Sequence, residues 1–307
     1  MYKAIGANKR NTFLIMAVFV GLISAIGYII SSFYGNTSIT YWVIGGAALY
    51  ALIQYFAAGK LAVAMTGAQE IEKRDNPRLY RVVENLSITL GMPMPKVYLI
   101  DDSAPNAFAT GRDPEHAVVC VTTGLMEKLD KTELEGVIAH ELSHVANYDI
   151  RMMSLIAVLV SIIALLSDFF LRWGFFMGGG RRRDGDSGGG QSQVIFMLIA
   201  IVLAIVAPII GVLIQLAVSR KREYLADASG ALLTRYPEGL ANALRKISGD
   251  TEPLEAANKA TANMYIINPL RANVKDKRGK GFGSKLFSTH PPTADRIAKL
   301  ESMDTHA

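Results

Sequence analysis

Long uncharged hydrophobic runs are the feature that most limits what this chain can fold into. One run covers residues 11–32, and a second covers residues 41–59 after a short link. An α-helix needs about 20 apolar residues to cross a bilayer, so each run is long enough to span it. Half of the 307 residues are hydrophobic, and the mean hydropathy is +0.25. The sequence therefore predicts a membrane protein in which residues 1–60 form a transmembrane hairpin.

Basic residues on both sides of this hairpin predict its orientation. Three precede the first run, five follow from Lys60 to Arg81, and none lies between. Lys and Arg are enriched on the cytoplasmic side of membranes, so both ends are expected in the cytosol. The charged start is similar to that of a signal peptide, but no cleavage site closes it, so we interpret the run as a retained anchor.

Two further runs, at about residues 152–171 and 194–218, predict a second membrane hairpin. Asp168 lies in the first of them, and the Gly/Arg-rich loop between them opposes the usual charge bias. These segments either cross the bilayer or enter it without crossing, and we favour crossing. The chain would then have about four transmembrane helices and a cytosolic domain in two parts, residues 61–151 and 219–307.

Charge and cysteine content narrow the possible partners. The net charge of +5 is mild, no nucleic-acid motif is present, and basic loops beside anionic lipid explain the charge more simply. The single cysteine, Cys120, excludes an intramolecular disulfide and is typical of a domain on the reducing side of the membrane.

The first soluble part is expected to combine a helix with a small β-sheet. The helix should run from about Gly67 to Leu90, where glycine and proline end it. Residues 96–100, 106–111 and 117–122 read as strands, the last two joined by a turn.

An open edge strand of this sheet can pair with an extended substrate backbone. That makes Asn106, Ala107 and Phe108 candidate substrate-binding residues. The alternative is a sheet that only supports the neighbouring helix.

The pattern H-E-x-x-H occurs at His140, Glu141 and His144. Asp130 and Glu133 have the spacing of a capping box, and an apolar stripe follows, so the pattern should lie on a helix. Residues four apart share a helix face, and both imidazoles can therefore point at one zinc ion. Glu141 faces the open side of the metal, where it can take a proton from water.

A catalytic zinc site needs a third protein ligand. A third histidine shortly after the pair is absent, and Glu223 is the best candidate downstream. Asp227, one helical turn later, is placed to accept a hydrogen bond from a ligand histidine. A solvated charged helix is the alternative for this stretch. Further on, His290 precedes two prolines, which restrict its backbone. A restricted histidine suits a group directed at an active site, and a lone surface histidine is an equally simple interpretation.

Together these motifs resemble the membrane zinc metallopeptidases of the HtpX type, relatives of the CAAX prenyl proteases. The resemblance spans nearly the whole chain. It rests on four ordered motifs: 106–111, 140–144 with Asn147 and Asp149, 222–224 with Ala226 and Asp227, and 289–292 with Arg296. It implies an α+β membrane protein: a mostly helical, gluzincin-like peptidase domain with a small sheet and about four transmembrane helices.

The resemblance also implies how the site works. His140, His144 and Glu223 would bind one zinc ion per subunit, with Glu141 as the catalytic base. His290 and Arg296 match positions near the active site and would assist the transition state, and Asn147, like Asp227, would lie beside the ligands.

The function implied is that of a zinc metalloendopeptidase that degrades damaged or misfolded membrane proteins. It would be a multi-pass protein of the cell inner membrane with its site facing the cytosol. A processing peptidase for one substrate is the nearest alternative. A scaffold with structural zinc is another, but it would need a fourth protein ligand, and no cysteine lies near the motif.

Overall fold

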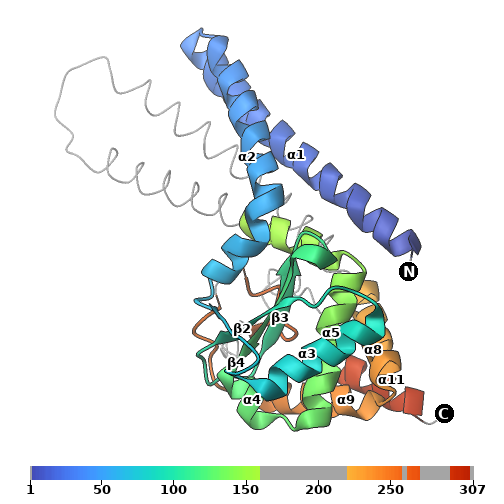
Figure 1. The fold of residues 1–307 in the computed structure, drawn as a ribbon. Coiled ribbons are helices and arrows are strands. Elements are labelled where there is room, and N and C mark those ends of the chain that lie inside the picture. The colour runs from blue at the N-terminus through green and yellow to red at the C-terminus, as the bar shows by residue number, and fades with distance from the viewer. Residues whose placement is uncertain (1, 160–219, 258–260, 270–290, 305–307) are drawn as a thin grey trace, which may run out of the picture.

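A pair of long helices extends from a soluble domain in the structure, which is a computed structural model (Figure 1). The structure describes residues 2–159, 220–257, 261–269 and 291–304. Helix α1 (Tyr2–Tyr34) and helix α2 (Ser38–Ala64) pack against each other along the pair. Within them, Ile5–Ile29 and Ser38–Ala64 are long and apolar enough to cross a membrane. These helices coincide with the runs predicted at residues 11–32 and 41–59, and their crossing of a membrane stays a prediction.

Large apolar side chains are exposed along this helix pair, as expected of surfaces that meet lipid. They include Phe13, Leu14, Trp42, Leu49 and Phe56. The spans predicted at 152–171 and 194–218 lie largely outside the described residues.

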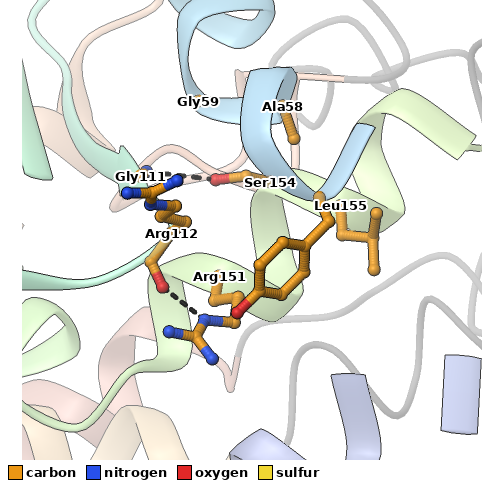
Figure 2. A pocket seen from close by; sticks show the side chains of 8 residues that line it. Ala58, Gly59, Gly111, Arg112, Arg151, Ser154 and Leu155 are labelled. Carbon is orange, nitrogen blue, oxygen red and sulfur yellow. Dashed lines mark hydrogen bonds between the residues drawn. The ribbon is translucent and has the colours of Figure 1, made fainter. Parts of the chain in front are cut away.

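A small apolar core joins the helix pair to the segment after the H-E-x-x-H helix. Residues 149–159 are helical, and Met152, Leu155 and Leu159 pack against Ile15 and Phe19 of α1. Figure 2 shows the adjoining pocket, where the end of α2 meets the sheet and the guanidinium of Arg151 donates to the carbonyl of Arg112. The membrane hairpin is thus packed directly on the soluble domain.

The predicted small sheet has four strands in the order β1-β2-β4-β3, where β1 is the short strand Gln69–Glu70. Strand β2 (Lys96–Ile100) is parallel to β4 (Ala117–Thr122), and β3 (Ala107–Gly111) is antiparallel to β4, with Phe108 opposite Cys120. The three predicted strands are confirmed, and β3 is an edge strand.

Alternation along the strands separates two cores. Ala107 and Ala109 of β3 belong to the main core with helices α3 (Pro77–Leu90) and α5 (Lys131–Ala146), whereas Phe108 lies on the opposite face. There Phe108 contacts Tyr265 edge-on, with ring centroids 4.9 Å apart. Because neighbouring residues in a strand face opposite sides, β3 faces the H-E-x-x-H helix with small side chains only.

The helix expected over residues 67–90 is wrong in its first part. Helix α3 covers Pro77–Leu90, and β1 (Gln69–Glu70) precedes it and pairs antiparallel with β2. The Asn76 side chain accepts from the Leu79 N–H, which begins the helix at this N-cap, with proline in the first turn. A local cap and a sheet partner outweigh helix propensity in the preceding residues.

The remaining helices cover the sheet and hold the candidate site (Figure 1). The structure places α4 at Thr123–Lys128, α5 at Lys131–Ala146, α8 at Arg220–Thr234, α9 at Pro237–Gly249 and α11 at Thr293–Asp304, with a 3-10 turn at Pro114–His116. Helix α5 packs against α3, α8, α9 and β3, so it is the centre of the domain. The described soluble part is therefore mostly helical with a small mixed sheet, as predicted.

Candidate metal centre

Helix α5 carries the H-E-x-x-H residues and is fixed at its start by its own side chains. Asp130 accepts a hydrogen bond from the Glu133 N–H at 2.9 Å, and the Glu133 carboxylate accepts from the Asp130 N–H at 2.8 Å. This is the capping box expected from the sequence. Lys246 of α9 also donates to Glu133 at 2.6 Å, which links the start of α5 to its neighbour.

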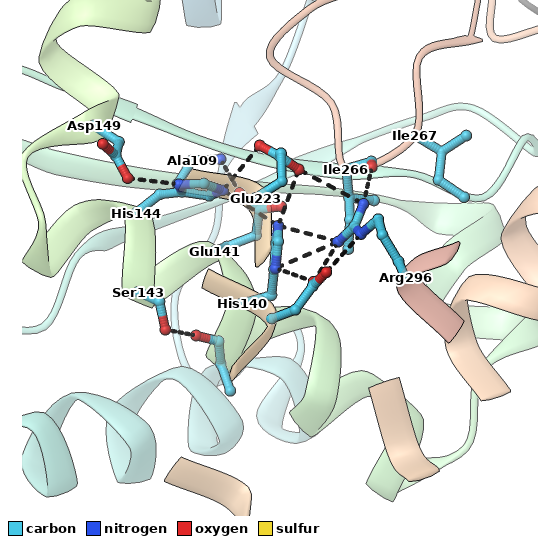
Figure 3. A network of polar contacts seen from close by, with 12 residues as sticks. Ala109, His140, Glu141, Ser143, His144, Asp149, Glu223, Ile266, Ile267 and Arg296 are labelled. Carbon is cyan, nitrogen blue, oxygen red and sulfur yellow. Dashed lines mark hydrogen bonds and ion pairs between the residues drawn. The ribbon is translucent and has the colours of Figure 1, made fainter. Parts of the chain in front are cut away.

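Three buried ligand groups converge at the other end of α5 (Figure 3). The Nε2 atoms of His140 and His144 are 3.2 Å apart. Glu223 of α8 brings Oε1 to 3.5 Å from His144 Nε2 and Oε2 to 3.9 Å from His140 Nε2. The three residues therefore form a group that can hold a metal ion, with each ligand atom within 4.8 Å of the others.

The donor set and its spacing fit zinc. Two imidazole nitrogens bound tetrahedrally at 2.0–2.1 Å would lie about 3.3–3.4 Å apart. The observed 3.2 Å between the two Nε2 atoms is close to that spacing. Two nitrogens and one carboxylate are also the ligand set of a catalytic site, which keeps one position open.

Each histidine is oriented by a carboxylate on its other ring nitrogen. His140 Nδ1 is 2.9 Å from Asp227 Oδ1, and His144 Nδ1 is 3.0 Å from Asp149 Oδ2. Such contacts place the Nδ1 proton between ring and carboxylate and leave Nε2 free to bind metal. The predicted partner Asp227 thus lies where the sequence suggested, whereas the role of Asp149 was not recognised. Its signal is an acidic residue five positions after the second histidine.

Glu141 lies beside the ligand group and is held by the edge strand. Its Oε2 accepts the Ala109 N–H of β3 at 2.8 Å, and the residue is 2% exposed. Burial, reinforced by the charge of Glu223, raises the pKa of Glu141 to about 8. A metal cation held by the neighbouring ligand group would oppose this shift, because it favours the carboxylate form of Glu141.

The two histidines have different electrostatic surroundings. Burial, together with the nearby guanidinium of Arg296, lowers the pKa of His140 to about 4. Burial also opposes protonation of His144, but the Asp149 hydrogen bond and the charge of Glu223 raise its pKa to about 9. The carboxylates around His144 favour a positive charge beside them. That charge can be a proton on the imidazole or a metal cation bound in its place.

Arg296 of α11 is buried beside the ligands and pairs with Asp227. Its Nε and Nη2 donate to the two carboxylate oxygens at 2.9 and 2.6 Å, and Nη1 donates to the Ile266 carbonyl at 3.0 Å. Burial opposes ionisation of Asp227, but the charge of Arg296 and the His140 hydrogen bond lower the pKa of this carboxyl.

The other predicted site residues lie in different places. Asn147 is the C-cap of α5, and His290 falls outside the described residues. The Asn106 amide donates to the Ile267 carbonyl, and the Ile266 N–H donates to the Ala107 carbonyl. Phe108 is fully buried on the opposite face. Along the backbone edge of β3, the Ala107 carbonyl is bonded to Ile266 and the Ala109 N–H is bonded to Glu141, so substrate binding at this strand stays a prediction.

Comparison with known proteins agrees with this geometry. The model of peptidase family M48 matches residues 73–304, which include every ligand candidate. The chain belongs to peptidase family M48. A protease HtpX homolog of Tropheryma whipplei (strain Twist) is 50% identical over 306 residues, covering 99% of this chain and 98% of that protein.

Other M48 relatives are similar over their full length. The protease HtpX homologs of Listeria monocytogenes serotype 4b (strain F2365) and Lactobacillus acidophilus (strain ATCC 700396 / NCK56 / N2 / NCFM) are 46% and 44% identical; each match covers 99% of this chain and 100% of the relative. The crystal structure of S. mikatae Ste24p has a TM-score of 0.50 at 20% identity, covering 96% of this chain and 66% of that chain, and this likeness concerns the fold alone. With two apolar helices long enough to span a bilayer, the chain is a membrane metallopeptidase of the M48 family.

Proposed function

We propose that this M48 chain is a zinc-dependent endopeptidase that binds one zinc ion per subunit through His140, His144 and Glu223. The observation that carries the proposal is the convergence of these three buried ligand groups next to Glu141. Zinc in such a site lowers the pKa of water toward about 7 and polarises the scissile carbonyl.

Glu141 is the proposed general base. Its Oε2 is held by the Ala109 N–H, which leaves Oε1 to accept a proton from the attacking water. The same carboxyl then returns the proton to the nitrogen of the scissile bond, which must be protonated so that it can leave as an amine when the C–N bond breaks. Asp149 and Asp227 keep the two histidines in the tautomer that binds metal, and Arg296 holds Asp227 in place.

Glu141→Gln tests this mechanism because it removes the base and leaves the ligands in place. We expect zinc content to stay at the wild-type level while casein cleavage falls by roughly 10²–10⁴-fold, the usual contribution of general acid–base catalysis. Zinc per folded chain and peptidase rate are measured on the full chain in detergent. Cleavage at the wild-type rate would rule Glu141 out as the base.

The proposed substrates are damaged or misfolded membrane proteins, because the site lies on a domain packed directly on a membrane hairpin. A panel of unrelated misfolded membrane proteins tests this breadth. Cleavage of one substrate at one terminus only would instead identify a dedicated processing peptidase.

We also propose four transmembrane helices, at about residues 11–32, 41–59, 152–171 and 194–218, with the site in the cytosol of an inner-membrane protein. The charge pattern around the first hairpin supports this orientation. The soluble part would then consist of residues 61–151, which follow the first hairpin, and residues 219–307, which follow the second.

Single-cysteine labelling in a Cys120→Ala background tests the topology. Cysteine at Thr37, between α1 and α2, and at Ser187, in the second loop, should both react with an impermeant reagent from outside the cell. Cysteine at the exposed Glu72 should react only after the cells are opened. Protection of Ser187 with labelling of Thr37 would show that the second pair of segments does not cross.

A further inference from the structure

The first turns of α1 contact the turn that follows the metal-binding helix. Asn8 of α1 is 3% exposed, and its amide Nδ2 donates to the Asn147 carbonyl at 3.0 Å and to Asp149 Oδ1 at 2.6 Å. Asn8 lies within the candidate span Ile5–Ile29. A buried amide in an apolar helix costs free energy unless it is hydrogen-bonded, and both contacts of Asn8 go to this one turn.

The carboxylate that Asn8 contacts is the one that orients a metal ligand. Asp149 is 2% exposed, and its two oxygens have separate partners. Oδ2 faces His144 Nδ1 at 3.0 Å, whereas Oδ1 accepts from Asn8 and lies 3.6 Å from Arg222 Nε. Since the short contact to Oδ1 comes from Asn8, loss of that amide would let the carboxylate rotate away from His144.

The backbone of the turn is strained, and α1 also stabilises it there. Tyr148 has φ of +61°, a left-handed conformation that is costly for an aromatic residue. The Lys9 ammonium lies 4.4 Å from the centre of its ring, and the Arg151 guanidinium lies 5.2 Å from it. These cation–π contacts oppose the strain and keep Asp149 directed at His144.

We propose that Asn8 is a positioning residue of the metal site and acts on His144 through Asp149. The inference rests on the proposed metal ligands and extends them to the membrane hairpin. Full metal affinity would then require α1 to be docked on the domain, which couples packing of the first membrane helix to completion of the active site.

Asn8→Leu is the variant that separates positioning from packing. Leucine has nearly the same shape and suits an apolar helix better, but it donates no hydrogen bond. We expect about 10-fold weaker zinc binding, the lower end for loss of a group that orients a ligand. Zinc affinity is measured by chelator competition on the full chain in detergent, and the visible spectrum of the Co²⁺-loaded chain reports the ligand geometry.

Two further variants keep the test decisive. Asn8→Gln retains an amide donor and should recover part of the lost affinity. Ser24→Ala removes a hydroxyl of the same helix that bonds only the Val20 carbonyl, so it should leave zinc affinity and spectrum unchanged. The unfolding temperature in chelator shows that each variant is folded.

A double-mutant cycle tests whether the effect passes through Asp149. Asp149→Ala alone should weaken zinc binding, and Asn8→Leu added to it should weaken binding no further. Wild-type affinity in Asn8→Leu, or full additivity in the double variant, would overturn the inference. Glu223→Ala separates this failure from that of the proposed function. If Glu223→Ala retains zinc, the metal site itself is misassigned. If Glu223→Ala loses zinc but Asn8→Leu has wild-type zinc affinity, only the role of Asn8 is overturned.

Discussion

Arg296 is fully buried beside the proposed metal ligands, yet its short ionic contacts, at 2.6 and 2.9 Å, are to Asp227, whereas the carboxylate of the proposed ligand Glu223 is 3.7 Å away. The guanidinium forms a two-pronged pair with Asp227, and Asp227 holds His140 Nδ1. A two-pronged pair fixes the plane of the carboxylate as well as its distance. This geometry favours a positioning role for Arg296, whereas the resemblance to the family suggested assistance to the transition state.

Arg296→Met should destabilise the fold and weaken zinc binding together. Removing one partner of a buried ion pair leaves Asp227 charged without its cationic partner, although the His140 Nδ1 contact stays, and such a loss costs about 3–5 kcal/mol. Arg296→Lys keeps the charge but loses the planar fork, so it should cost less. Denaturant unfolding in chelator and chelator competition measure the two effects. Wild-type stability and zinc affinity with a lower kcat would instead return Arg296 to a catalytic role.

At the scale of elements, the site depends on how closely α8 approaches α5. Gly230 of α8 lies two turns after Glu223, so both face the same side of the helix. A Cβ at Gly230 would lie 3.0 Å from the backbone nitrogen of His140 and 3.3 Å from the carbonyl carbon of Ala139. Both contacts are with α5 backbone, which cannot rotate away as a side chain can.

Gly230→Ala should therefore move α8 outward and pull Glu223 from the histidines. Overpacking of this kind typically costs 1–3 kcal/mol, and we expect weaker zinc binding with it. Gly249→Ala is the control, because the last residue of α9 is also a helical glycine but has open space for a Cβ. Equal zinc affinity in the two variants would show that α8 has room to adapt.

At the scale of the whole molecule, the proposed metal ligands come from segments that lie far apart in the sequence. His140 and His144 precede the second pair of hydrophobic runs, and Glu223 follows it. A metal bound by all three therefore links segments that the membrane region separates in sequence. Anything that binds the folded state alone also stabilises that state.

Zinc should therefore raise the unfolding temperature of the wild-type chain, and a chelator should lower it. At free zinc 100 times its dissociation constant the gain is about 2.7 kcal/mol. Thermal unfolding with zinc and with chelator measures the difference. In Glu223→Ala, the difference in unfolding temperature between zinc and chelator should be much smaller. A difference equal to that of the wild type would place the metal elsewhere.

The sequence by itself determined the elements whose signals are local. The capping box and apolar stripe of α5 were predicted and are confirmed, because both arise from residues within one or two helical turns. The three main strands follow from alternation, which a strand imposes on its own residues. Glu223 could be proposed because a catalytic zinc site with two histidines needs a third ligand, and because Asp227 follows Glu223 by one helical turn.

Only the tertiary structure decided the contacts between distant segments. Where a helix was predicted to start, the structure has strand β1, because its backbone forms hydrogen bonds with β2. Arg296 pairs with Asp227, and Asn8 reaches Asp149, although neither pair has any periodicity or spacing that a sequence displays. These contacts depend on where packed helices bring their side chains. That placement is set by the shared apolar cores, which no single stretch of sequence specifies.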